Sequence, residues 1–461
     1  MKNKYFGTDG FRGEANVNLT AEHAYKIGRF LGWYFTSELC KTDKATTKPR
    51  IVIGKDTRRS SYMLEYALCS GIIASGGDAY ILHVTTTPSV SYVVRTECFD
   101  CGIMITASHN PFYDNGIKLI NRYGEKFDDD ATSLIEKYID GKLEELGIDG
   151  DDLPLAHREQ IGAIVDFVSG RNRYVGYLIS LASHSYKQLK IGLDCANGAS
   201  WSIAKAVFDA LGAVTYVVGN TPNGININRE CGSTHIENLQ ALVRNNHLDI
   251  GFAFDGDTDR CIAVDEKGNV VDGDKMMYVL ANRLKTRGML TNNTVVATIM
   301  SNSGFVNSLK KLGINCELTT VGDRFVYERM QQKNYDLGGE QSGHIILKKY
   351  ATTGDGLLTA IMICEEICDK KLQLSKLCED VFVYPQFTKN IRVADKKAAI
   401  TNDDVLKTVK QIEEKIDGKG RVLLRESGTE PVVRVMVECE SDKLCREYAE
   451  MIAQAIIEIL K

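Results

Sequence analysis

The chain has 461 residues, of which 44% are hydrophobic and 25% charged, and 56 basic against 61 acidic residues give a formal net charge of −5. This length predicts three or four domains of ordinary globular composition. The charge balance, without a basic stripe, argues against nucleic-acid binding. No apolar run approaches the roughly 18–20 residues of a membrane span, and the N-terminus lacks the apolar region of a signal peptide. We therefore expect a cytoplasmic protein that binds neither nucleic acid nor membrane.

The 13 cysteines are scattered and odd in number, which is typical of free thiols in a reducing cytosol. Cys98 and Cys101 form a CxxC motif, which can be a redox pair or half of a zinc site. The chain has no second CxxC and no paired histidines at zinc-finger spacing, and the motif adjoins an apolar, strand-like run. The motif therefore predicts two thiols in the protein core.

A strand–helix–strand pattern occurs three times along the chain. Each copy has an apolar run, a helical stretch, a glycine and a second apolar run, and the first runs lie at 51–56, 189–194 and 294–300. The glycines, at 76–77, 212 and 313, fit the left-handed residue that ends many helices. Short runs rich in Val and Ile are typical of buried parallel strands. The pattern predicts three related α/β domains with mixed sheets.

The C-terminal part of the chain follows another pattern. Runs at 422–425 and 432–438 predict two strands joined by a polar turn, and apolar residues at helical spacing follow, among them Met451 and Ile452. This predicts a smaller α+β domain. With boundaries in polar, glycine-rich segments, the four expected domains are 1–155, 156–268, 269–378 and 379–461.

Four polar loops each follow an apolar run, which is where α/β sheets place ligands. The first loop, at 106–111, contains Ser108. This serine can act as a nucleophile or phosphate carrier, and it can also be a simple helix cap or turn residue. The ammonium group of Lys118, close by in sequence, favours the functional interpretation.

The second loop places Asp255, Asp257 and Asp259 at alternate positions between two apolar runs. Such carboxylates repel one another unless a cation neutralises them. A solvated charge run is the weaker interpretation, because the loop stands between two apolar, strand-like runs and not on an open helix face. An EF-hand calcium loop is the competing interpretation, because Glu266 matches the final ligand of such a loop. However, an EF-hand would have glycine where Arg260 stands, and helices rather than strands would flank it. We therefore predict a divalent metal site. Mg²⁺ is preferred because three carboxylates leave positions for phosphate oxygens.

The third loop, at 338–344, combines paired glycines with Glu340, Ser342 and His344, whose polar atoms suit sugar hydroxyls or an amine. Such loops also serve as simple turns. In the fourth loop, Arg425 and Arg434 bracket a Ser-Gly-Thr turn that can cradle a phosphate. The chain has neither a Walker A nor a GxGxxG motif, so the phosphate is not expected to belong to a nucleotide.

Together and in this order, the four loops and the N-terminal motif FGTDGFRG (6–13) resemble the α-D-phosphohexomutase superfamily over essentially the whole chain. The resemblance implies three α/β domains and a smaller C-terminal domain around a central cleft, which agrees with the repeats. GGEQSGH and RESGTEPVVRVM are most similar to the bacterial branch that acts on glucosamine phosphate. The branch that acts on glucose and mannose phosphates, whose sugar loop more often reads GEMSGH, is the alternative.

The resemblance implies an isomerase that interconverts glucosamine 6-phosphate and glucosamine 1-phosphate for UDP-N-acetylglucosamine synthesis. A phosphorylated Ser108 gives its phosphoryl group to the substrate, and the resulting 1,6-bisphosphate turns round and returns its other phosphate to the serine. The resemblance places one Mg²⁺ between the phosphoserine and Asp255, Asp257 and Asp259, where it offsets charge during transfer. A sugar 1,6-bisphosphate is the expected activator.

The resemblance also assigns the remaining site residues. Near the transferring phosphate it places Arg12, His109, Lys118 and Arg260, and Lys118 and His344 are both candidates for moving the proton. Residues expected to bind the sugar are Gly322, Asp323, Glu340, Gln341 and Ser342. Residues expected to bind the other phosphate are Arg425, Ser427, Gly428, Thr429 and Arg434. The ligand is thus a hexose or hexosamine phosphate, and a homodimer is the candidate oligomeric state.

One position departs from the family pattern. Thr258 stands where relatives usually have glycine or alanine, and a positive φ there would strain the metal loop because threonine is β-branched. A sugar-phosphate-binding scaffold without turnover is the non-enzyme alternative. Nothing in the sequence supports that loss, because the serine, the three aspartates and both phosphate-binding arginines are present.

Overall fold

The computed structural model of the chain describes residues 4–7, 9–41, 48–426 and 432–458. It divides into two compact units, Met1–Ile299 with Glu317–Cys378 and Met300–Cys316 with Glu379–Lys461. Each unit is described by itself. Within the described ranges, no helix is both long and apolar enough to span a bilayer.

The first sheet of the larger unit has seven strands in the order β1-β2-β6-β5-β3-β4-β7. The central strands β3, β4, β5 and β7 pair in parallel, and β1, β2 and β6 pair antiparallel, so the sheet is mixed. The strands are β1 Phe6–Gly7, β2 Gly10–Glu14, β3 Arg50–Lys55, β4 Asp78–Val84, β5 Cys101–Ile105, β6 Asp114–Asn121 and β7 Ile164–Asp166. The helices are α1 Ala21–Lys41, α2 Arg59–Ala74, α3 Thr87–Thr96 and α4 Asp129–Ile139, with short 3₁₀ turns η1 Glu144–Leu146 and η2 Arg158–Gln160.

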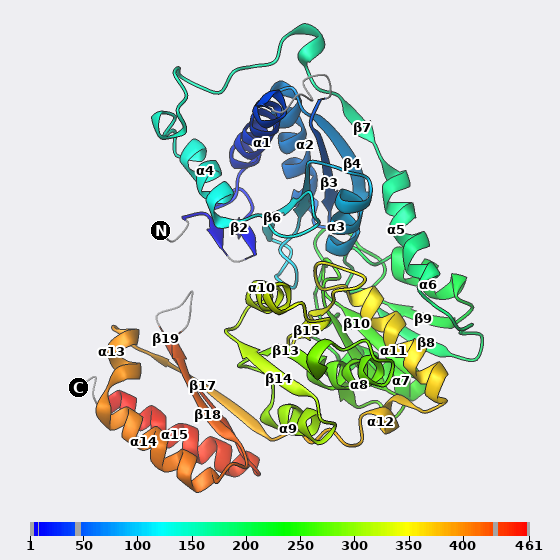
Figure 1. Cartoon of the computed structure of the whole chain (residues 1–461), viewed down its shortest axis with the longest axis vertical. Helices are drawn as coiled ribbons and strands as arrows, with labels where there is room; N and C mark the ends of the chain where they lie inside the picture. The colour runs from blue at the N-terminus through cyan, green and yellow to red at the C-terminus, as the bar shows by residue number, and fades with distance from the viewer. Residues whose placement is uncertain (1–3, 8, 42–47, 427–431, 459–461) are drawn as a thin grey trace. The chain divides into compact units, whose positions relative to one another are not determined.

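Strand β3 shows why this sheet is covered on both faces. Ile51 and Ile53 belong to the same buried cluster as Leu68 of α2, whereas Val52, between them, packs with Val93 of α3. Alternate side chains of a strand point to opposite faces, so an apolar run without alternation requires a helical layer on each side. Figure 1 shows α1 and α2 side by side, and α3 lies apart from them.

The second sheet has five strands in the order β12-β11-β10-β8-β9. Strands β8, β9 and β10 are parallel, and β11 returns antiparallel to β10, so the loop that joins β10 to β11 lies at the end of the parallel strands. The strands are β8 Lys190–Asp194, β9 Val214–Val218, β10 Ile250–Phe254, β11 Cys261–Asp265 and β12 Val270–Val271, and the helices are α5 Val168–Ser180, α6 Ile203–Ala210 and α7 Glu237–Asn246.

The third sheet has four strands in the order β14-β13-β15-β16. Strands β15 and β16 form an antiparallel pair, and the loop between them carries the predicted sugar-binding residues. The strands are β13 Thr294–Thr298, β14 Asn315–Thr319, β15 Leu337–Gly339 and β16 Ile345–Leu347. The helices are α8 Gly273–Thr286, η3 Thr291–Asn293, α9 Ser303–Lys311, α10 Asp323–Lys333, α11 Gly356–Lys370 and α12 Leu374–Leu377.

The predicted repeat is confirmed as β3-α2-β4, β8-α6-β9 and β13-α9-β14. Gly76, Gly212 and Gly313 follow the three helices with φ values of 90°, 95° and 64°. This left-handed conformation favours glycine because glycine has no Cβ.

The smaller unit contains an antiparallel sheet in the order β17-β19-β18. Its strands are β17 Gln386–Arg392, β18 Arg421–Glu426 and β19 Val432–Glu438, and its helices, besides α9 in the segment Met300–Cys316, are α13 Lys396–Thr401, α14 Asp403–Ile416 and α15 Asp442–Glu458. Figure 1 shows α14 and α15 together against this sheet. The α+β pattern predicted from the sequence is confirmed, and β17 adds a strand. The buried face of α15 runs through Cys445, Ala449 and Ile452, while Met451 is 39% exposed, because neighbouring positions of a helix with 3.6 residues per turn point to different sides.

The structure confirms a four-domain α/β fold class with three mixed sheets and a smaller α+β domain. The domain boundaries stay predictions, and β7 of the first sheet lies beyond residue 155. The prediction for the CxxC motif is half correct. Cys101 is buried in β5, but Cys98 is exposed with a φ of 54°, because it lies in the turn that precedes the strand rather than in the strand itself. All twelve cysteines that the structure describes are free thiols.

Candidate active site

Ser108 lies in the loop that follows β5. Its hydroxyl points toward residues 255–260, the loop between β10 and β11 that carries the three aspartates and is called the metal loop below. The residue is only 1% exposed, and its Oγ donates a hydrogen bond of 2.5 Å to Asp255 Oδ2. Its backbone has a φ of 52°, which is uncommon for a residue with a side chain. The Thr106 hydroxyl accepts a hydrogen bond from the Ser108 amide at 2.9 Å, which supports this conformation. A serine held in this way faces the carboxylates directly.

Asp255, Asp257 and Asp259 form one buried cluster in the loop between β10 and β11. All three have a carboxylate oxygen within 4.8 Å of the others. The Oδ1 atoms of Asp257 and Asp259 are buried and accept no hydrogen bond from any residue that the structure describes. Burial, together with the charges of Asp259 and Asp257, raises the pKa of Asp255 well above its ordinary value. Buried carboxylate oxygens without donors fit a hard divalent cation such as Mg²⁺.

Thr258, between two of these aspartates, has a φ of 65°. This is the left-handed region, where a β-branched side chain is strained. The loop holds it there by two backbone hydrogen bonds, from its own amide to Asp255 O at 3.1 Å and from the Gly356 amide to its carbonyl at 2.9 Å. The departure from the family pattern therefore falls where the backbone would favour glycine.

Lys118, on β6 of the first sheet, reaches the metal loop of the second. Its Nζ lies 2.8 Å from Asp257 Oδ2, 3.1 Å from Asp259 Oδ2 and 3.4 Å from Asp9 Oδ2. Burial alone would lower the pKa of this ammonium group, but the three carboxylates outweigh burial and raise it well above the usual value. Lys118 therefore stays charged.

His109 and Arg260 lie together beside the serine. Arg260 Nη1 is 3.2 Å from His109 Nδ1, and Ser108 Oγ is 3.4 Å from the same nitrogen. Burial and the charges of Arg260 and Arg12 lower the pKa of His109 to about 4. His109 is therefore neutral near neutral pH, with Nδ1 as an acceptor. Arg12, on β2, forms an ion pair with Asp9.

The loop between β15 and β16 carries the predicted sugar-binding residues. Glu340 Oε1 accepts a hydrogen bond from the Gly322 amide at 3.1 Å, and burial raises the pKa of Glu340. Ser342 is exposed. The side-chain amide of Gln341 donates to Asp272 Oδ2 at 3.2 Å and is therefore engaged at the start of α8.

His344 ends the same loop and is 3% exposed. Its Nε2 accepts a hydrogen bond from the Gly354 amide at 3.0 Å, and its Nδ1 lies 3.8 Å from Asp259 Oδ1. The Gly354 contact requires a lone pair on Nε2, which assigns the ring proton to Nδ1 when the ring is neutral.

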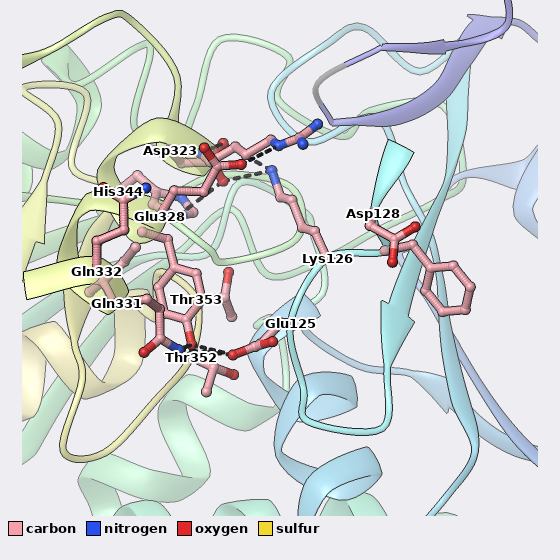
Figure 2. A pocket seen from close by; sticks show the side chains of 14 residues that line it. Glu125, Lys126, Asp128, Asp323, Glu328, Gln331, Gln332, His344, Thr352 and Thr353 are labelled. Atoms are coloured by element: carbon pink, nitrogen blue, oxygen red, sulfur yellow. Dashed lines mark hydrogen bonds and ion pairs between the residues drawn. The ribbon is translucent and has the colours of Figure 1, made fainter. Parts of the chain in front are cut away.

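Figure 2 shows Lys126, which follows β6, reaching Asp323 at the start of α10. Lys126 Nζ is 2.7 Å from Asp323 Oδ2 and 2.8 Å from Asp9 Oδ1, and His344 Nε2 is 3.4 Å from Asp323 Oδ2. Asp323 is thus bound to a lysine of the first sheet domain. A cavity of about 360 Å³ adjoins this pair and reaches His344 and Glu125.

In the smaller unit, Arg425 on β18 lies directly opposite Arg434 on β19. Burial and the charge of Arg434 lower the pKa of Arg425. Two like charges in facing positions of a sheet repel each other, and an anion between them relieves the repulsion. The other predicted members of this phosphate loop, Ser427, Gly428 and Thr429, lie outside the described residues.

Sequence reasoning missed several residues that contact the predicted site residues, among them Asp9, Arg58, Lys126 and Asn228. Asp9 stands inside the FGTDGFRG motif that carries the resemblance, and Arg58 follows the apolar run 51–56 as each of the four loops follows such a run. Lys126 and Asn228 belong to no pattern in the sequence. Only the folded chain brings them to their partners.

Comparisons with known proteins identify the family of the chain. Four models of the phosphoglucomutase/phosphomannomutase family match the chain, for α/β/α domain I at residues 3–145, domain II at 172–268, domain III at 272–384 and the C-terminal domain at 389–455. The chain belongs to this family, within the phosphohexomutase superfamily. It is therefore a mutase, an enzyme of the isomerase class.

Among curated relatives, the phosphoglucosamine mutase of Lachnospira eligens is 57% identical over 453 residues, covering 98% of each chain. Among solved structures, a phosphoglucomutase/phosphomannomutase family protein from Burkholderia thailandensis has a TM-score of 0.77 at 22% identity and covers 99% of this chain and 98% of its own. The N-acetylphosphoglucosamine mutase of Aspergillus fumigatus, in complex with GlcNAc-6P and magnesium, has a TM-score of 0.70 at 16% identity and covers 100% of this chain and 96% of its own. Both structures have the same fold as this chain.

Proposed function

We propose that this enzyme interconverts glucosamine 6-phosphate and glucosamine 1-phosphate in the cytoplasm, for UDP-N-acetylglucosamine synthesis. The observation that carries the chemistry is the direct contact between Ser108 Oγ and Asp255 in a buried carboxylate cluster. The sugar is supported by the name of the Lachnospira relative, which is identical at 57% of positions.

In the proposed reaction, Ser108 carries a phosphoryl group. Its Oγ–P bond breaks while a bond forms between phosphorus and the free hydroxyl oxygen of the sugar, whose proton passes to a basic group. Lys118 and His344 both stay candidates for moving a proton, His344 as a group that can accept it and the charged Lys118 as one that can only donate it. Arg12, Lys118 and Arg260 bind the oxygens of the transferring group, and neutral His109 accepts a hydrogen bond beside the serine.

Asp255, Asp257 and Asp259, with the phosphoserine, would hold one Mg²⁺, which offsets negative charge during transfer. The buried Oδ1 atoms of Asp257 and Asp259, which accept no hydrogen bond in the described structure, support this assignment. The magnesium in the Aspergillus enzyme supports it by analogy of fold.

The 1,6-bisphosphate formed in this way turns round and returns its other phosphate to Ser108. Glu340 and Ser342 bind the sugar hydroxyls, with Gly322, Asp323 and Gln341 in support. Arg425 and Arg434, with Ser427, Gly428 and Thr429, bind the phosphate that does not react. A sugar 1,6-bisphosphate would act as activator by phosphorylating Ser108. The proposal also includes the four domain ranges given above. It further includes a homodimer, which a measurement of molar mass by light scattering tests.

A mutase assay with Mg²⁺ and a matching bisphosphate tests the proposal by comparing kcat/KM for glucosamine, glucose and mannose phosphates. We expect at least a tenfold preference for glucosamine phosphate, about 1.4 kcal/mol in the transition state. A preference for glucose or mannose phosphate would keep the chemistry and reassign the substrate. No turnover of any of the three would contradict the proposal.

A further inference from the structure

Two side chains from different sheet domains bind the same pair of backbone carbonyls in the serine loop. Arg58 Nη2 donates to Ser108 O at 3.2 Å and to Asn110 O at 2.6 Å. Asn228 Nδ2 donates to the same two oxygens, at 2.8 Å and 3.0 Å. Because both partners are carbonyl oxygens, only the NH₂ end of the Asn228 amide can face them. The loop is thus held by four hydrogen bonds from two donors.

Both donors are themselves fixed. Arg58 is fully buried and forms an ion pair with Asp56, whose Oδ1 also accepts hydrogen bonds from the Arg58 amide and from Ser61 Oγ. Asn228 is 7% exposed and lies between β9 and α7, where its backbone amide donates a hydrogen bond to Ala196 O at 2.8 Å. Buried and doubly bonded groups lose little further entropy when they hold a loop, so they can define its position closely.

The loop needs such support because Ser108 has a φ of 52°, a conformation that residues with side chains seldom adopt. The metal loop also lies directly against it. A methyl group at Gly256, next to Asp255, would collide with Ser108 O. The carbonyl that Asn228 and Arg58 hold therefore sets the distance between the serine and the carboxylate cluster.

We propose that Asn228 is a positioning residue for the phosphoserine, assisted by Arg58 from the opposite domain. It sets the angle of Ser108 Oγ toward the carboxylate cluster by fixing the carbonyls of Ser108 and Asn110. No hydrogen bond of Asn228 in the described structure reaches Glu340 or the loop at 340–344, so we expect it to act on the serine loop rather than on sugar binding. This inference rests on the proposed function, in which Ser108 is the phosphate carrier.

The test uses Asn228→Asp. Aspartate has nearly the same size as asparagine and also tolerates the left-handed φ of 57° at this position, but it turns a carboxylate oxygen instead of an NH₂ group toward the two carbonyls. Asn223→Asp is the matched control, because this exposed residue of the same loop uses its oxygen to accept the Ile225 amide. The unphosphorylated full-length enzyme is mixed with glucose 1,6-bisphosphate and Mg²⁺, and phosphate on Ser108 is followed by mass spectrometry. In this step a sugar O–P bond breaks, the Oγ–P bond forms and the serine proton passes to the sugar oxygen.

We expect Asn228→Asp to slow phosphorylation of Ser108 by about 100-fold, the effect of a small misplacement of a reacting atom. In steady state, kcat should fall while KM for the sugar phosphate stays within about twofold. Asn223→Asp should match the wild type. A folded Asn228→Asp enzyme that is phosphorylated at the wild-type rate would overturn the inference.

If Asn228→Asp loses its folded structure, Asn228→Gly gives the test, because glycine keeps the left-handed backbone and removes the donor. Loss of the folded state in both variants would also overturn the inference, since Asn228 would then be a folding residue. A wild-type enzyme that fails to phosphorylate Ser108 would instead contradict the proposed function.

Discussion

Ser108 Oγ donates a hydrogen bond of 2.5 Å to Asp255 Oδ2, although 147 positions separate the two residues in the sequence. The contact joins the loop after β5 of the first sheet to the loop after β10 of the second. It places a hydroxyl group at the edge of a buried carboxylate cluster, and the proposed chemistry depends on this placement.

Replacement of Ser108 by alanine should abolish turnover, because the proposed reaction passes the phosphoryl group through Ser108 Oγ. Ser108 is buried rather than on the surface, so Ser108→Ala also leaves Asp255 without its hydroxyl donor and should lower the free energy of unfolding by about 1–3 kcal/mol. Activity assays and urea denaturation measure the two effects. Ser89→Ala is the control, because Ser89 Oγ is also buried but has no hydrogen-bond partner in the described structure. Turnover by Ser108→Ala would remove this serine from the mechanism.

Asp257→Asn should weaken Mg²⁺ binding by at least about tenfold, because an amide oxygen is a poorer ligand than a carboxylate oxygen for a hard cation. Titration of Mg²⁺ by calorimetry and by activity measures the change. Asp249→Asn should bind Mg²⁺ as the wild type does, because Asp249 directly precedes β10, at the end of the strand away from the cluster, and its Oδ2 accepts a hydrogen bond from the Lys190 amide. Equal Mg²⁺ affinity in the two variants would place the metal elsewhere.

Lys126→Met should raise KM for the sugar phosphate by about tenfold, with a smaller effect on kcat. Lys126 holds Asp323, and the neighbouring Gly322 amide holds Glu340, so loss of the ammonium group loosens the proposed sugar site. Lys126→Arg keeps the positive charge and should restore most of the affinity. An unchanged KM in Lys126→Met would show that the Asp323 contact does not support sugar binding.

Arg425→Met should weaken the stabilising effect of phosphate on the protein. Removal of one of two facing charges relieves repulsion without an anion, and it also removes a donor to the proposed phosphate. Melting temperatures with and without inorganic phosphate measure both effects, because a ligand that binds only the native state raises Tm. Arg446→Met is the control, because it also removes one positive charge from the smaller unit, but from a side chain that lies over the Phe387 ring and is not part of the proposed phosphate site. The same phosphate response in both variants would contradict the proposed phosphate site.

The stability of the protein should depend on pH through Asp355, which caps α11 and accepts a hydrogen bond from Tyr174. Burial raises the pKa of Asp355 from 3.8 to about 6. A raised pKa in the folded state stabilises the protein fully below pH 4, and this contribution is lost as pH rises through 6. The loss amounts to about 3 kcal/mol for a shift of this size.

Asp355→Asn should remove this contribution, because asparagine caps helices well and does not ionise. Urea denaturation at pH 4 and pH 7 compares the variant with the wild type, so that the titration of all other groups cancels. The same change in unfolding free energy between the two pH values in both proteins would show that Asp355 does not titrate as described.

The sequence allowed prediction of the features that depend on local pattern. The repeated strands, the glycines after the helices and the alternating aspartates of the metal loop are all encoded within short segments. Ser108 and the carboxylate cluster could therefore be predicted as separate loops at strand ends. The interpretation of Cys98 as a core thiol was wrong, because Cys98 lies in the turn before β5 and is exposed, whereas only Cys101 belongs to the buried strand.

Contacts between distant segments could not be predicted. The sequence gives no sign that Asn228 binds the Ser108 carbonyl or that Lys126 reaches Asp323, since each partner comes from another sheet domain. In α15, of the two apolar residues named from the helical spacing, Ile452 is buried and Met451 is exposed, so the spacing alone did not tell which of them faces the core. Hydrophobic spacing predicts an element, but its partners are set by the tertiary fold.

The central claim is that Ser108 carries the phosphate between substrate and product. The most direct measurement mixes the enzyme with Mg²⁺ and isotopically labelled glucose 1,6-bisphosphate and maps the label by peptide mass spectrometry. We expect label on the peptide that contains Ser108, its loss when glucosamine 6-phosphate is added, and no label in Ser108→Ala. Turnover without label on Ser108, or label on another residue, would contradict it.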